Sequence, residues 1–288
     1  MKFHCNSCDG VYSNSLDVRF SKKCDNNCSF CIEKKGICGM ETNVEKLIAS
    51  TKESQKETVL ILGGEPLLDL PKVLEYVKGI RGFIKEIYIT TSLPKSIEED
   101  WEVFCELMTL IDGLNVSLQH YYPSKNNEIL RASSKHNRIN LLATMCENKE
   151  FAKKIRVSIN LVKGSIDNKR DLDIFLCVMQ EIHVEHVKIN ELQDSEDLYV
   201  SFEEIYGMKL KSAYAHGCQT DISLPNYSMR ITLKRACFKV NENLQATFMD
   251  CCKAIIKSIW GNGKKYTSIS KNVLYENGDL ADGWITQK

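Results

Sequence analysis

Apolar residues along the chain fall into six short, nearly continuous runs that are bounded by polar residues, glycine or proline. Runs of this length that are rich in Val, Ile and Leu are typical of strands buried on both faces of a sheet. We therefore predict six strands, at residues 16–20, 58–64, 86–92, 114–119, 154–164 and 186–192.

Segments with a helical spacing of apolar residues separate the predicted strands. In the clearest of them, Ser96 stands three residues before Glu99, which is the pattern of a capping box. Thr42 or Asn43 can cap the first of these segments. Helices are predicted at residues 44–51, 71–80, 96–112, 136–147 and 168–182.

The alternation of strands and helices predicts parallel pairing with right-handed crossovers. Six units are too few to close an eight-stranded barrel, so we expect an α/β fold, an open partial (β/α)6 barrel, over residues 16–193. A polar N-terminal segment, residues 1–15, precedes it. After about residue 193 the alternation stops. We expect residues 194–288 to form a C-terminal α+β extension that covers the open side of the barrel and the active site, with a strand at 229–238 and a helix at 246–260.

Composition narrows the class of protein. The chain has 288 residues, of which 43% are hydrophobic and 26% charged, and its formal net charge is zero. No global field therefore draws it to nucleic acid or membrane. No apolar stretch approaches the roughly 20 residues of a membrane span, and the N-terminus lacks the apolar run of a signal peptide. Thirteen cysteines, an odd number, would be hazardous in an oxidising compartment, so we expect a reducing cytoplasm.

Three cysteines follow the first predicted strand. Cys24, Cys28 and Cys31 have the spacing C-x3-C-x2-C, and closely spaced thiolates suit an iron–sulfur cluster. A cluster of four irons held by three thiolates keeps one iron open, as catalytic metal sites do. The alternative is a structural zinc site, for which Cys38 is near enough in sequence to supply the fourth ligand.

This window, with Phe30 just before the last cysteine and the sequence GGEP from Gly63 to Pro66 after the next strand, resembles the radical S-adenosylmethionine (SAM) enzymes. The resemblance implies a [4Fe–4S] cluster on the three thiolates, with SAM on the fourth iron. It also implies that reduction cleaves SAM to methionine and a 5′-deoxyadenosyl radical, which abstracts a substrate hydrogen. An external one-electron donor such as a flavodoxin or ferredoxin is then required.

Candidate SAM contacts lie at the predicted carboxyl ends of the strands, where ligands gather in parallel sheets. The resemblance assigns Gly63, Gly64, Glu65 and Pro66 to the amino group of SAM, and Phe30 to its adenine. Polar side chains at the ends of later strands are candidates for the carboxylate and ribose, although polar residues also end strands for structural reasons. They are Thr90, Thr91, Ser92, Ser117 and Asn160.

Two residues after the fourth predicted strand are candidates for catalysis. His120 has an unperturbed pKa near neutrality and is a candidate proton donor or acceptor; the alternative is a loop histidine without a role. Arg131 lies in a segment where the resembled family often has an arginine near SAM or substrate. Gln119, Tyr121 and Tyr122 beside His120 would be substrate contacts at the barrel mouth.

A second cluster or zinc site is the open question of the extension. Thirteen residues separate Cys237 from Cys251, which resembles part of the auxiliary-cluster pattern of molybdenum-cofactor cyclases. The C-x2-C sequence that accompanies this pattern is missing, because the residue three before Cys237 is Lys234. Cys218 and Cys252 are further candidate ligands. Cys5 and Cys8, spaced C-x2-C, either assist such a site or are free thiols.

Charge is uneven around residue 206. Residues 171–204 contain ten acidic residues and one basic, and residues 208–271 contain eleven basic and three acidic. A solvated surface explains most such runs, but a basic extension beside an active site also suits a phosphate or carboxylate. We therefore expect a small, anionic or nucleotide-like substrate. Peptide modification is the alternative reaction, a non-catalytic metal-binding scaffold or regulatory protein is the alternative class, and a nucleic-acid substrate comes third.

Overall fold

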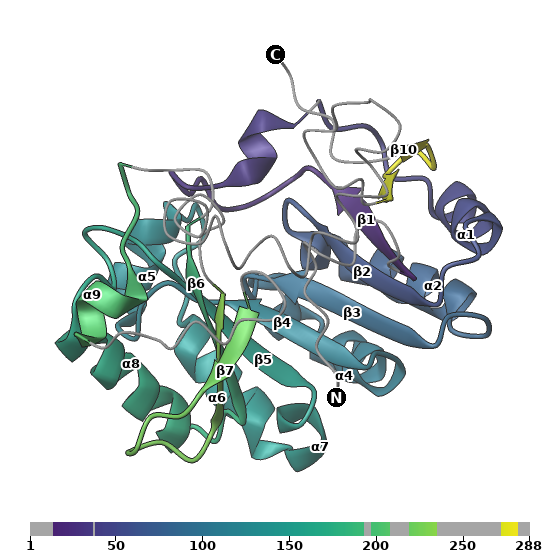
Figure 1. Ribbon diagram of the computed structural model, residues 1–288. Helices are drawn as coiled ribbons and strands as arrows, with labels where there is room; N and C mark the ends of the chain where they lie inside the picture. The colour runs from purple at the N-terminus through teal and green to yellow at the C-terminus, as the bar shows by residue number, and fades with distance from the viewer. Residues whose placement is uncertain (1–13, 37, 193–196, 208–218, 235–271, 282–288) are drawn as a thin grey trace, which may run out of the picture.

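The computed structural model describes residues 14–36, 38–192, 197–207, 219–234 and 272–281. A curved sheet forms the centre of this part of the chain, and helices lie along its outer side (Figure 1). Six neighbouring strands pair in parallel and in sequence order, which confirms the six predicted strands. They are β1 (Ser15–Ser21), β2 (Thr58–Gly63), β3 (Glu86–Thr91), β4 (Gly113–Ser117), β5 (Ile155–Leu161) and β6 (His186–Glu191).

Four strands from the C-terminal part of the sequence extend this sheet at both edges. The order of the described strands is β10-β9-β1-β2-β3-β4-β5-β6-β8-β7, so the sheet is open, as predicted for a partial barrel. β8 is parallel to β6, and β9 is parallel to β1. The four strands are β7 (Gln219–Ile222), β8 (Arg230–Lys234), β9 (Val273–Tyr275) and β10 (Leu280–Ala281). The strand predicted at 229–238 is therefore present as β8, whereas the helix predicted at 246–260 lies outside the described residues.

Four of the predicted helices are present, and asparagine side chains cap three of them. Asn43 accepts a hydrogen bond from the backbone N–H of Lys46 at the start of α1, and Asn137 and Asn168 do the same for α6 and α8. The four are α1 (Val44–Glu53), α2 (Leu70–Ile80), α6 (Arg138–Glu147) and α8 (Lys169–Glu181). The structure also contains the short elements η2 (Ile32–Lys35), η3 (Pro66–Asp69), α5 (Pro123–Leu130), α7 (Lys149–Ala152) and α9 (Phe202–Tyr206).

The single helix predicted at 96–112 is wrong. The chain forms α3 (Ser96–Glu99) and α4 (Trp101–Leu110), which are separated at Asp100 with φ −121° and ψ 48°. The predicted capping box is wrong as well, because the Ser96 hydroxyl donates to the carbonyl of Leu67 at 2.6 Å and not to its own helix. This bond ties α3 to η3, the turn that follows the Gly-Gly-Glu sequence.

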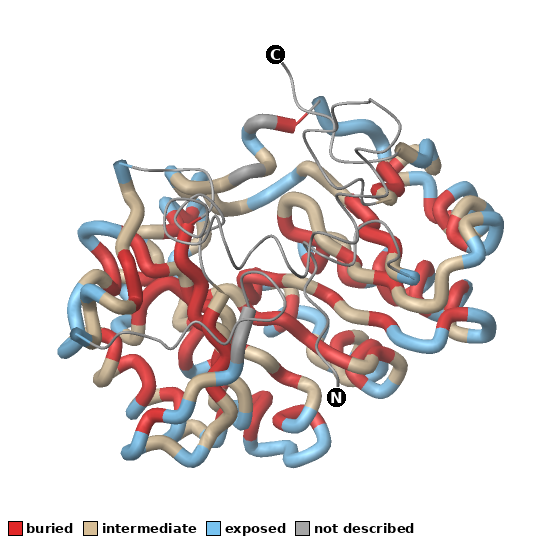
Figure 2. Tube along the Cα trace, in the orientation of Figure 1, coloured by how far each residue is buried: buried red, intermediate tan, exposed pale blue. Residues whose placement is uncertain are grey.

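The two faces of the sheet have different chemistry. Val157, Ile159, Val187 and Ile189 are fully buried in the core between the sheet and the helices, where the strands and the inward sides of the helices are buried together (Figure 2). Their neighbours in β5 and β6 are polar and point to the opposite, inner face. No helix of the described chain is long and apolar enough to cross a membrane.

Candidate active site

The three cysteines of the C-x3-C-x2-C sequence lie on the loop that leaves the carboxyl end of β1. The Cys28 thiol donates to the carbonyl of Leu130 at 3.6 Å, and the Cys24 sulfur accepts from the N–H of Asn26 at 3.4 Å. Burial, together with the neighbouring Cys31 and Cys24 thiols, raises the pKa of Cys28 to about 12. The three sulfur atoms are therefore close enough to interact electrostatically.

This donor set fits a cubane cluster better than a single metal ion. Among the described residues, no three His, Cys, Asp or Glu side chains converge to hold one ion. A cluster instead takes each thiolate on a separate iron, which suits three thiols that gather without meeting at one point. Cys38, the fourth ligand of the zinc alternative, is exposed, and its carbonyl accepts from Arg19. The cysteines proposed for a second site (Cys5, Cys8, Cys218, Cys237, Cys251 and Cys252) lie outside the described residues.

The glycines after β2 hold the cysteine loop. The N–H of Gly64 donates to the carbonyl of Ser21 at 2.6 Å, and the N–H of Glu65 donates to that of Lys23 at 2.7 Å. A Cβ atom on Gly64 would lie 2.2 Å from the Lys23 oxygen. Gly63 has φ +129°, a conformation that favours glycine. The glycines thus let two strand ends approach each other, and their predicted contact with SAM stays a prediction.

Glu65 lies beneath this junction and accepts four hydrogen bonds. It is 2% exposed. One carboxylate oxygen accepts from the Leu67 N–H at 3.1 Å and the Thr91 hydroxyl at 2.8 Å. The other accepts from the Ser92 N–H at 2.6 Å and the Ser92 hydroxyl at 2.7 Å. Burial raises the pKa of Glu65, and these donors lower it. Glu65, Thr91 and Ser92, predicted as separate SAM contacts, therefore bind one another, which joins the ends of β2 and β3.

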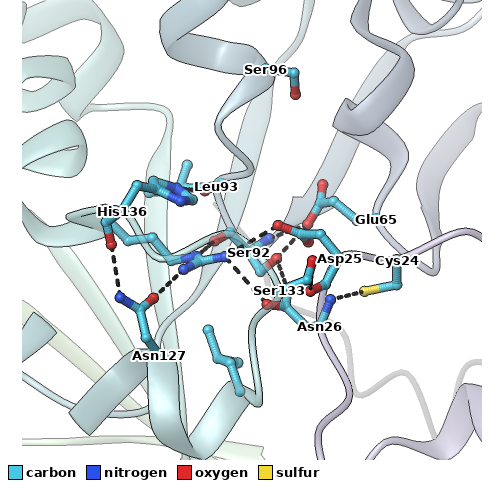
Figure 3. A network of polar contacts seen from close by, with 12 residues as sticks. Cys24, Asp25, Asn26, Glu65, Ser92, Leu93, Ser96, Asn127, Ser133 and His136 are labelled. Carbon is cyan, nitrogen blue, oxygen red and sulfur yellow. Dashed lines mark hydrogen bonds and ion pairs between the residues drawn. The ribbon is translucent and has the colours of Figure 1, made fainter. Parts of the chain in front are cut away.

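Arg138, at the start of α6, connects this group to the cysteine loop, and the sequence analysis missed it. It is 1% exposed. Its Nε donates to the carbonyl of Ser92 at 2.8 Å, and its Nη2 lies 3.4 Å from the Asp25 carboxylate and 3.3 Å from the Asn26 side-chain oxygen. The Asn26 amide in turn donates to the Ser92 hydroxyl at 2.7 Å. Figure 3 shows the network around Ser92, in which loop, strand-end and helix side chains converge.

The predicted arginine, Arg131, has a different setting. It is exposed and ends α5 in the left-handed conformation, with φ 49°. The residue before it is closer to the site, because the Leu130 carbonyl accepts from the Cys28 thiol and from the Asn27 N–H. In the sequence, Arg138 is visible only as a charged residue in the first turn of the predicted helix, followed by Ile139, which the structure shows to be buried. The role predicted for Arg131 stays a prediction.

Polar residues form rows across the inner face of the sheet. Register pairs place Ser117 beside Ser158 and Ser158 beside Lys188. The next row toward the carboxyl ends of the strands contains Asn160, Asn190 and Lys234. The next row toward the amino ends, on the other side of the Ser117 row, contains Thr90, Asn115 and Arg156. Three predicted SAM contacts, Thr90, Ser117 and Asn160, thus share the inner face. Thr91 alternates to the other face, where it meets Glu65.

His120 is buried in the loop after β4. Its Nδ1 accepts from the N–H of Tyr122 at 3.0 Å, and its ring packs against Tyr121 with centroids 4.2 Å apart and ring planes tilted by 33°. Burial lowers the pKa of His120, which favours the neutral ring. Because Nδ1 accepts a hydrogen bond, the proton of the neutral ring is on Nε2. The proton transfer predicted for His120 stays a prediction. Phe30 lies half-buried on the cysteine loop, beside Cys31.

Comparisons with known proteins identify the family of the chain. The sequence profile of the Radical SAM superfamily matches residues 18–176. This is more than half of the chain, and the chain therefore belongs to the radical SAM superfamily. Membership implies SAM and a [4Fe–4S] cluster as cofactors, and the expected fold and family are confirmed. A search of curated proteins finds no match to the chain.

Solved structures resemble the fold at low sequence identity. SuiB from Streptococcus suis bound to the precursor peptide SuiA has a TM-score of 0.59 and 16% identity, over 94% of this chain and 60% of SuiB. A radical SAM methyltransferase from Sphaerobacter thermophilus has a TM-score of 0.54 and 14% identity, over 74% and 66% of the two chains. Native anSMEcpe with bound AdoMet and the Cp18Cys peptide has a TM-score of 0.50 and 12% identity, over 67% and 56%. The chain therefore spans about 60% of SuiB, and the likeness concerns the fold.

Proposed function

We propose that the chain is a radical SAM enzyme in which Cys24, Cys28 and Cys31 hold the [4Fe–4S] cluster. The observation that carries the proposal is the gathering of three thiols on a loop that Gly64 and Glu65 fasten to the end of β2. When bound, the cluster supplies an electron that cleaves SAM and releases a 5′-deoxyadenosyl radical. The protein orients the substrate C–H bond and excludes solvent.

In this proposal the chain's own residues position SAM. Gly63 to Pro66 bind its amino group, Phe30 contacts its adenine, and the inner-face side chains of Thr90, Ser117 and Asn160 hydrogen-bond its carboxylate and ribose. Three of these side chains share the inner face, which supports a common ligand. In this proposal Thr91 and Ser92 do not contact SAM themselves but orient Glu65, because their hydroxyl groups donate hydrogen bonds to its carboxylate.

The inner face also supports an anionic substrate. Arg156, His186 and Arg230 are neighbours in one row, and Lys188 lies in the next. Burial lowers the pKa of His186 to about 3; the charges of Arg156 and Arg230 lower it as well, and that of Asp221 opposes them. The Asp221 carboxylate pairs with Arg230 at 2.8 Å. We propose that a phosphate or carboxylate of a small substrate binds on this side of the sheet.

Peptide modification is the second candidate, because the fold likeness to SuiB bound to its precursor peptide extends over 94% of the chain. For either substrate we propose a flavodoxin or ferredoxin as electron donor in a reducing cytoplasm. The exposed Cys24 and the exposed lysines Lys23 and Lys34 on the cysteine loop support the approach of an acidic donor.

The test of the reaction is anaerobic reconstitution with iron and sulfide, reduction with dithionite, and assay of 5′-deoxyadenosine from added SAM. Cys28→Ala should abolish the product, and Cys105→Ala, which removes a half-buried thiol on α4, should retain it. An iron count near four or near eight per chain would distinguish one cluster from two. A loaded cluster that cleaves no SAM with any reductant would refute the proposal and favour a scaffold.

The substrate class is tested by calorimetry on the reconstituted protein. Inorganic phosphate, a mononucleotide, a dicarboxylate and a neutral peptide are titrated against the wild type and Lys188→Gln. Binding of the anions that weakens in Lys188→Gln would support the first candidate. Binding of the peptide alone, unchanged in the variant, would favour peptide modification.

A further inference from the structure

We propose that Arg138 is a positioning residue that fixes the cysteine loop and, through its charge, raises the reduction potential of the cluster held there. The inference rests on the proposed function, since it needs the [4Fe–4S] cluster on Cys24, Cys28 and Cys31. It concerns one buried guanidinium that belongs to α6 and not to the cysteine loop.

The guanidinium joins α6 to three other segments of the site. Nε donates to the Ser92 carbonyl after β3, and Nη1 donates to the side-chain oxygen of Asn127 on α5. Nη2 faces the Asp25 carboxylate at 3.4 Å and the Asn26 side-chain oxygen at 3.3 Å, both on the cysteine loop. A planar guanidinium presents its donors in a fixed fork. The position of Asp25 and Asn26 relative to Ser92 is therefore set by one rigid group.

The charge of this group acts on the cluster ligands directly. Arg138 lies within electrostatic range of the Cys24 and Cys28 thiols as well as of Asp25 and Glu65. Its side chain is fully buried, and that of Asp25 is 10% exposed, so solvent screens neither strongly. Net charge and hydrogen bonding near a cluster set its reduction potential. A buried cation favours the reduced, more negative cluster, and a buried carboxylate opposes it.

Asp25 makes the charge effect separable from a packing effect. One of its oxygens, Oδ1, is buried and has no hydrogen-bond partner among the described residues, so Arg138 is its charged partner at the other oxygen. Removal of the cation should lower the potential, and removal of the carboxylate should raise it. A purely structural role predicts no such opposite signs, because both changes loosen the same loop.

The experiment is a redox titration of the reconstituted protein, followed by the electron paramagnetic resonance signal of the reduced cluster, with iron content measured on every sample. We expect Arg138→Gln to lower the reduction equilibrium constant by about tenfold, which is about 59 mV for one electron. Asp25→Asn should shift the potential upward, and Arg138→Lys, which keeps the charge, should stay near the wild type. Arg81→Gln, which breaks an ion pair with Asp112 on the outer surface, is the matched control and should leave the potential unchanged.

An iron-loaded Arg138→Gln with an unchanged or higher potential would overturn the inference, as would Asp25→Asn and Arg138→Lys that both shift downward. If Arg138→Gln fails to load, Asp25→Asn and Arg138→Lys decide the question with the same signs. A wild-type protein that takes up no cluster refutes the proposed function itself. That result is distinct from a wild-type cluster whose potential does not respond to these charges.

Discussion

Replacement of Gly64 by alanine tests how the glycines after β2 support the cysteine loop. The added Cβ would lie 2.2 Å from the carbonyl oxygen of Lys23 and 2.6 Å from that of Lys22. Both are backbone atoms, so no side-chain rotation relieves the contact. The loop that carries the three cysteines must move away from β2.

The magnitude follows from what this movement breaks. Two backbone hydrogen bonds, from Gly64 to Ser21 at 2.6 Å and from Glu65 to Lys23 at 2.7 Å, hold the loop. Each contributes about 1 kcal/mol, and overpacking of a well-packed region costs about 1–3 kcal/mol. We therefore expect Gly64→Ala to lower the free energy of unfolding by about 3–5 kcal/mol, a large share of the roughly 5–15 kcal/mol of a typical domain.

The assay is urea denaturation of the apo-protein, together with iron and sulfide analysis after anaerobic reconstitution. Iron content should fall with stability, because the displaced loop carries the three cysteines proposed to hold the cluster. Gly82→Ala is the matched control, since a Cβ on Gly82 meets no atom within 4 Å, and it should change the free energy of unfolding by no more than about 0.5 kcal/mol. A Gly64→Ala protein with wild-type urea midpoint and wild-type iron would refute the reasoning.

Three further predictions concern buried polar groups. Glu276→Gln removes the carboxylate that accepts from the fully buried Arg19 at 2.8 Å, so the free energy of unfolding measured in urea should fall by about 3–5 kcal/mol. The control is Glu57→Gln, which breaks the exposed ion pair between Glu57 and Lys85. An equal or smaller loss for Glu276→Gln than for this control would contradict the prediction. Glu65→Gln puts an amide donor against backbone and hydroxyl donors and should cost about 1–3 kcal/mol in the same assay, whereas an unchanged midpoint would show that the four bonds contribute nothing. The depressed pKa of His186, about 3 against about 6.5 in the unfolded chain, means that the unfolded chain takes up the proton first. Stability should therefore fall as the pH drops from about 6.5 toward 3, and urea midpoints of His186→Gln should depend less on pH in that window; an identical slope would exclude His186 as the cause.

The central sheet was predictable because each of its strands is visible as a pattern within its own short stretch of sequence. Buried parallel strands such as β2 and β6 are continuous apolar runs, and the chain returns to the sheet after each helix. The edges were not predictable in this way. β9 has three residues and pairs with β1, more than 250 residues earlier in the sequence. No periodicity in either segment indicates that pairing.

The candidate site divides in the same manner. The cysteines and the strand-end residues Ser117 and Asn160 could be proposed from the sequence because their side-chain chemistry stands at known points of the repeating strand–helix unit. Arg138 could not, because an arginine in the first turn of a helix is typical of a surface. What distinguishes it from Arg131 is tertiary packing, which buries one guanidinium and exposes the other.

The cysteine loop also depends on the C-terminal part of the sequence. In the first part of the loop, Gly64 hydrogen-bonds to Ser21, and Arg138 contacts Asp25 and Asn26. In the segment after Cys31, the N–H of Met40 donates to the Glu276 carboxylate at 2.7 Å. The same carboxylate accepts from two nitrogens of Arg19. Arg19 in turn donates to the Cys38 carbonyl and lies over the Tyr275 ring at 4.4 Å. Because one buried carboxylate after β9 joins β1 to the segment beyond Cys31, we expect a change in the C-terminal strands to shift the three cysteines through the backbone that follows them.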